Sequence, residues 1–74
     1  MKPAEIAALM AEVLQVNEFT EHDNFFELGG SSLLAVALVS KINEKSSAEV
    51  SLIDLIYAPT AAGITERLAR GGAR

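Results

Sequence analysis

The chain has 74 residues, no cysteine, six Lys or Arg against ten Asp or Glu, and a formal net charge of −4. A chain this short forms one small domain. The lack of cysteine excludes disulfides and thiolate-metal sites. The excess of acidic residues excludes a broad basic surface of the kind that binds nucleic acid. No apolar run reaches the roughly 20 residues of a membrane span, and the N-terminus lacks the apolar segment of a signal peptide. We therefore expect a single, monomeric, cytoplasmic domain over residues 1–74.

The first half of the chain holds two helical patterns. Residues 2–16 contain Pro3, which suits a first helical position, and repeat apolar residues at spacings of three and four. Residues 32–45 repeat the same periodicity. The residues expected to face the core from these two helices are Ile6, Leu9, Met10, Val13, Leu14, Leu34, Ala35, Leu38, Val39 and Ile42.

The second half predicts two shorter helices. Residues 50–57 are apolar, and we interpret them as a short helix because no partner strand exists elsewhere in the chain. Pro59 ends that helix, and Thr60 caps a last one over residues 61–70, with Ile64 and Leu68 inward. Residues 71–74 are expected to fray. The predicted fold class is all-α, a small four-helix bundle with a long first loop.

That first loop, residues 17–31, mixes turn formers with large apolar side chains. Its large apolar side chains are Phe19, Phe25, Phe26 and Leu28. We expect some of the aromatic ones to insert into the core and hold the loop in place. His22 is the only histidine and lies among acidic neighbours, which makes it poor material for a metal site.

The loop ends in Gly29-Gly30-Ser31-Ser32, directly before the second helix. Glycine permits a sharp turn there, and Ser31 is the expected N-cap, which leaves the Ser32 hydroxyl accessible in the first turn. Such a position favours a phosphate or phosphodiester on the hydroxyl. The Lys of a phosphate-binding loop is missing, and a hydrolase triad of Ser32, His22 and Asp23 would lack room for a substrate cleft in so small a bundle.

The outward face of the second helix is more apolar than a solvated helix requires. Helical spacing places Leu33, Val36, Ala37 and Ser40 together on this face, beside Ser32. We interpret the face as a docking surface for partner proteins. The alternative is that Leu33 and Val36 cover the phenylalanine-rich loop.

Three segments resemble the peptidyl carrier (thiolation) domains of nonribosomal peptide synthetases, relatives of acyl carrier proteins. The central segment is Asp23–Ala35, and the similarity continues through Leu38–Ile42 and resumes at Ala58–Thr60. The resemblance implies a right-handed four-helix bundle. It also implies a 4′-phosphopantetheine arm on Ser32, supported by Gly29, Gly30 and Ser31, because Leu33 follows the modified serine in the family motif. The arm's thiol would hold an aminoacyl or peptidyl group as a thioester.

The resemblance further implies a carrier without catalytic activity of its own in natural-product biosynthesis, for example of antibiotics. Its partners would be a phosphopantetheinyl transferase and adenylation, condensation, thioesterase or tailoring enzymes. Ser31 departs from the family, which often has Asp or His there, whereas fatty-acid carriers typically have Asp-Ser-Leu and an acidic second helix. These differences favour the peptidyl type over an acyl carrier of a polyketide or hybrid synthase. An unmodified helical interaction module is the alternative of another class.

Overall fold

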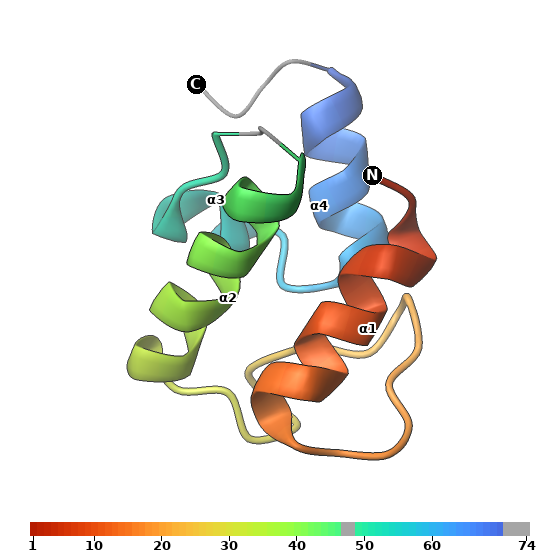
Figure 1. Cartoon of the computed structure of the whole chain (residues 1–74), viewed down its shortest axis with the longest axis vertical. Coiled ribbons are helices and arrows are strands. Elements are labelled where there is room, and N and C mark those ends of the chain that lie inside the picture. The colour runs from red at the N-terminus through yellow and green to blue at the C-terminus, as the bar shows by residue number, and fades with distance from the viewer. Residues whose placement is uncertain (47–48, 71–74) are drawn as a thin grey trace.

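The computed structural model describes residues 1–46 and 49–70, which form the predicted bundle of four helices (Figure 1). The helices are α1 (Pro3–Leu14), α2 (Ser32–Ser46), α3 (Leu52–Tyr57) and α4 (Ala61–Ala69). Helix α1 packs against α2 and α4, and α3 packs against α2 and α4. The described residues contain no strand. The expected frayed end at 71–74 lies outside the described residues.

The helix boundaries differ from the expected ones where a terminal residue leaves the helical conformation. Helix α1 ends at Leu14, two residues early, because Gln15 turns into the left-handed region with φ 58°. Helix α3 begins at Leu52 because the Ser51 side chain caps it from an extended backbone. Thr60 caps α4 as predicted, accepting a hydrogen bond from the Gly63 N–H.

The core lies between the four helices and includes one residue from the loop. Phe25 is fully buried and packs among residues of all four helices. The largest of the fully buried side chains are those of Phe25, Ile6, Met10, Leu38, Ile42, Leu55 and Ile64. Val13, Leu14, Leu34, Val39 and Leu68 were expected in the core and are only partly buried, at its margin.

Helix α3 buries a carboxylate and exposes apolar side chains. Asp54 is 4% exposed, whereas Ile53, Ile56 and Tyr57 are more than half exposed. The Asp54 carboxylate accepts hydrogen bonds from the Ser51 N–H and hydroxyl and from the guanidinium of Arg67 on α4. The sequence pattern predicted the helix but gave no indication of this buried ion pair.

Candidate functional site

Ser31 and Ser32 occupy different positions at the start of α2. Ser31 is the N-cap, and its hydroxyl oxygen accepts a hydrogen bond from the Leu34 N–H at 3.3 Å. Ser32 is the first helical residue and is exposed. Among the described residues, the Ser32 hydroxyl has no hydrogen-bond partner. The Ser32 hydroxyl is therefore the one that a second molecule can reach.

The two glycines before the serines serve different physical purposes. Gly29 has φ +110°, a conformation that side-chain-bearing residues rarely adopt, and space around it is open. At Gly30 an added Cβ would lie 2.5 Å from the Phe25 ring. Gly29 therefore allows the turn, and Gly30 lets the chain cross closely over the buried ring just before Ser31.

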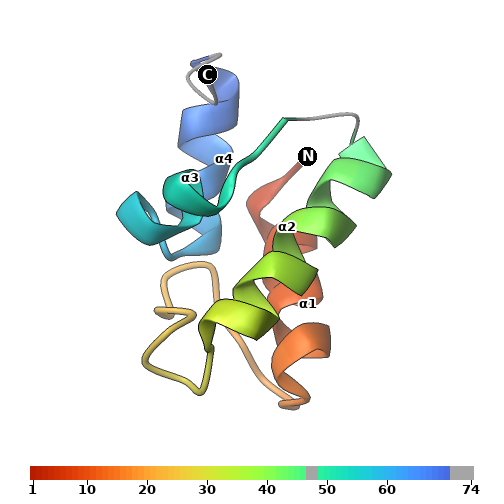
Figure 2. The same ribbon diagram turned by 90° about the vertical axis from the view of Figure 1, so that its left-hand side faces the viewer.

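Hydrogen bonds tie the loop to the connection between α3 and α4. The Phe25 N–H donates to the Pro59 carbonyl at 2.9 Å, and the Ala62 N–H donates to the Glu21 carbonyl at 3.0 Å. Figure 2 shows the loop below α3 and α4, leading into the first turn of α2. With the Phe25 ring in the core, these bonds hold the chain that precedes Ser32 in one place.

The remaining loop aromatics take a secondary part in this anchoring. Phe26 is partly buried, and its ring meets the Phe25 ring edge-on, with centroids 5.4 Å apart. Phe19 is also partly buried, whereas Leu28 is 44% exposed. The expectation that some of the loop aromatics insert into the core is confirmed for Phe25, which is fully buried.

The face of α2 next to Ser32 is open to solvent. Leu33 is 80% exposed and Val36 53% exposed, and Ala37 and Ser40 are also exposed. The exposure of Leu33 and Val36 argues against the alternative that they cover the phenylalanine-rich loop. The described chain leaves this apolar face uncovered.

The residues of the hypothetical hydrolase triad do not assemble. His22 is exposed, and the Asp23 carboxylate accepts a hydrogen bond from the Thr20 N–H at 2.8 Å. Neither side chain is hydrogen-bonded to Ser32. Within the described residues, no group of three or more His, Cys, Asp or Glu side chains could hold a metal ion, and no helix is long and apolar enough to cross a membrane.

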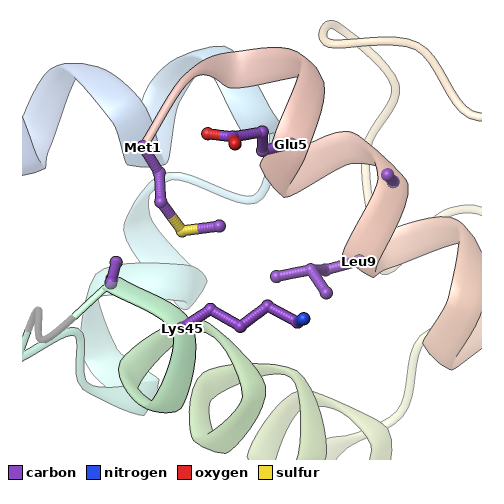
Figure 3. A pocket seen from close by; sticks show the side chains of 6 residues that line it. Met1, Glu5, Leu9 and Lys45 are labelled. Carbon is purple, nitrogen blue, oxygen red and sulfur yellow. The ribbon is translucent and has the colours of Figure 1, made fainter.

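Two surface hollows of the described chain lie away from Ser32. The larger one, of about 620 Å³, is found between the start of α1 and the end of α2, with Glu5 and Lys45 on opposite walls (Figure 3). A second hollow runs between α1 and the first part of the loop, from Asn17 to His22. Ser32 lines neither of them. The accessible serine is therefore a surface site.

Comparisons with known proteins agree with this geometry. Residues 4–68 match the family model described as "Phosphopantetheine attachment site". The chain is 47% identical over 66 residues to a dimodular nonribosomal peptide synthase of Bacillus subtilis, and 49% identical over 63 residues to a linear gramicidin synthase of Brevibacillus parabrevis. These matches cover 89% and 85% of the chain but only 3% and 1% of the two relatives.

Solved structures show the same fold. A type-II acyl carrier protein involved in bleomycin biosynthesis in Streptomyces verticillus superposes with a TM-score of 0.87 at 32% identity, over 93% of this chain and 83% of that one. A peptidyl carrier protein solved with the phosphopantetheine transferase Sfp and coenzyme A superposes with a TM-score of 0.86 at 28% identity, over 92% of this chain and 88% of that one. The chain therefore belongs to the phosphopantetheine attachment family, as a peptidyl carrier domain of the nonribosomal peptide synthetase type.

Proposed function

We propose that Ser32 is the residue to which 4′-phosphopantetheine is attached. The observation that supports this most directly is the exposed, unpartnered hydroxyl of Ser32 at the first position of α2. The open space beside Gly29 leaves room for a phosphodiester, and Ser31 is already engaged as the cap. Gly29, Gly30 and Ser31 are the supporting loop of this site.

When bound, the group supplies a terminal thiol that holds an aminoacyl or peptidyl cargo as a thioester, which a chain without cysteine does not offer itself. The chain positions and presents the attachment point and performs no catalytic step. The anchored loop supports this role, because Phe25 and its hydrogen bond to Pro59 fix where the arm begins.

The partners of this activity are a phosphopantetheinyl transferase, which modifies Ser32, and adenylation, condensation, thioesterase or tailoring enzymes, which act on the cargo. We place their docking surface on the α2 face formed by Leu33, Val36, Ala37 and Ser40. Its exposure and its position beside Ser32 support this assignment. The surface is small, as suits a transient contact of less than about 1,200 Å².

Intact-mass measurement tests the attachment site. The purified chain is incubated with coenzyme A and a broad phosphopantetheinyl transferase. Wild type and Ser31→Ala should gain the mass of one phosphopantetheine group, and Ser32→Ala should gain nothing. Attachment at Ser31 in a peptide map would refute the assignment, and an unmodified wild type would favour the plain interaction module.

Loading assays separate the peptidyl carrier from an acyl carrier of a polyketide or hybrid synthase. The modified chain is offered to adenylation domains with amino acids and to acyltransferases with acyl thioesters. We expect aminoacylation to be the faster reaction. The opposite preference would assign the chain to the polyketide type.

A further inference from the structure

The start of α2 lacks the negative side chain that two other helices have. Glu5 in α1 and Asp54 in α3 stand in the first turn of their helices, where each accepts a hydrogen bond from the backbone at the cap. The first turn of α2 holds no acidic residue, and its cap is the neutral Ser31. The partial positive charge at the start of α2, the longest of the four helices, is therefore not offset by a side chain.

Among the described residues, neither the first turn of α2 nor the loop before it holds a Lys or Arg that could serve as an alternative counter-charge for an anion. The sequence has no Lys or Arg between Lys2 and Lys41. Lys41 lies 3.9 Å from Glu12, Arg67 is bound to Asp54, and Arg70 is bound to Glu66. Lys45 lines the hollow at the opposite end of α2. The N–H groups of Ser32 and Leu33, which have no backbone acceptor among the described residues, are the donors next to the Ser32 hydroxyl.

We propose that the phosphodiester formed on Ser32 is the missing negative charge of α2, so that attachment of the arm stabilises the folded domain. This inference rests on the proposed attachment at Ser32. A negative group in the first turn interacts favourably with the helix dipole, and for a domain of this size the effect corresponds to a rise in melting temperature of about 2–6 °C. The site thus couples modification to stability.

The experiment compares the melting temperatures of the unmodified and fully modified chain, with complete modification verified by intact mass. At low ionic strength the modified chain should melt at the higher temperature. At about 1 M salt, where the Debye length is about 3 Å, this increment should shrink. An increment that salt leaves unchanged would indicate that the arm packs on apolar side chains and would overturn the proposal.

Two charge-adding variants make the test specific to the start of α2. Ser31→Asp places a carboxylate at the cap, so it should stabilise the unmodified chain and reduce the increment on modification by at least half. The control is Asn17→Asp, which adds the same charge at an exposed loop residue, and its increment should equal that of wild type. A full increment in Ser31→Asp, or none in wild type, overturns the proposal. A failure of attachment is seen separately as the absence of a mass gain.

Discussion

At the scale of single residues, Asp54 is the titratable group whose charge the fold depends on. The hydrogen bond from the Ser51 backbone N–H, together with the Arg67 guanidinium, outweighs burial and lowers the pKa of Asp54. A lowered pKa means that the charged carboxylate stabilises the folded state above the ordinary carboxylate value of about 4. This contribution is lost as the pH falls through the lowered pKa.

We predict that Asp54→Asn destabilises the domain by about 1–3 kcal/mol at neutral pH, because Ser51 and Arg67 lose a charged acceptor. This destabilisation is smaller than that expected for breaking a fully buried ion pair, because the Arg67 side chain is 34% exposed and partly hydrated. Urea unfolding at neutral pH and at pH values below about 4 measures the difference. The gap between wild type and variant should narrow as the pH falls.

The exposed pair between Arg70 and Glu66 supplies the control for this measurement. Both side chains are mostly in solvent, so Glu66→Gln should change stability by less than about 0.5 kcal/mol at any pH. If Asp54→Asn were equally mild, or if its deficit were independent of pH, the assigned role of the buried carboxylate would be wrong.

At the scale of elements, the first loop behaves as a fifth structural unit whose one fully buried side chain is Phe25. Phe25→Ala removes a fully buried ring and should cost about 3–5 kcal/mol, a large part of a total of about 5–15 kcal/mol. Phe26→Ala removes a partly exposed ring and should cost clearly less. Thermal melting of both variants shows which substitution lowers the stability of the domain more. A loss at Phe26 as large as that at Phe25 would contradict this anchoring.

The helices differ in how far the sequence predicted them. In α1 and α2 the apolar spacing predicted the helix and most of its fully buried residues, because these helices bury one regular stripe. It missed Ala7 and placed partly buried residues such as Val13 and Val39 in the core. In α3 the same reasoning predicted a helix but not its orientation. Asp54 faces inward because Arg67, 13 residues later in the chain, lies opposite it. A partner that far along the chain produces no recognisable pattern in the sequence around Asp54.

At the scale of the whole molecule, the start of α2 and an aromatic anchor for the loop before it were predictable, and the long-range hydrogen bonds that hold this loop were not. The cap at Ser31, the exposed Ser32 and the outward α2 face follow from local rules and agree with the structure. The hydrogen bond between Phe25 and Pro59 joins segments far apart in sequence, so only the folded chain reveals it. Attachment at Ser32, docking on α2 and a cytoplasmic location stay predictions.

The docking surface on α2 can be tested because it is exposed enough to change without damaging the fold. Leu33→Asp and Val36→Asp alter side chains that are more than half in solvent, so neither should lower the melting temperature appreciably. Val36→Asp should melt near wild type, and Leu33→Asp, which adds a charge to the first turn of α2, should melt at or slightly above it. If partners dock there, an introduced charge opposes burial of the apolar contact, and arm attachment or cargo loading should slow about 5–30-fold, as expected for about 1–2 kcal/mol.

Val16→Asp is the matched control, since it places the same charge on an exposed apolar residue outside α2. Its modification and loading rates should equal those of wild type. Rates are measured by time-resolved intact mass, with the partner enzyme at a concentration below saturation so that weakened docking is visible. Wild-type rates in both α2 variants, with normal stability, would remove this face from the mechanism. Slow rates in Val16→Asp as well would mean that partners respond to the net charge of the domain and not to the apolar face beside Ser32.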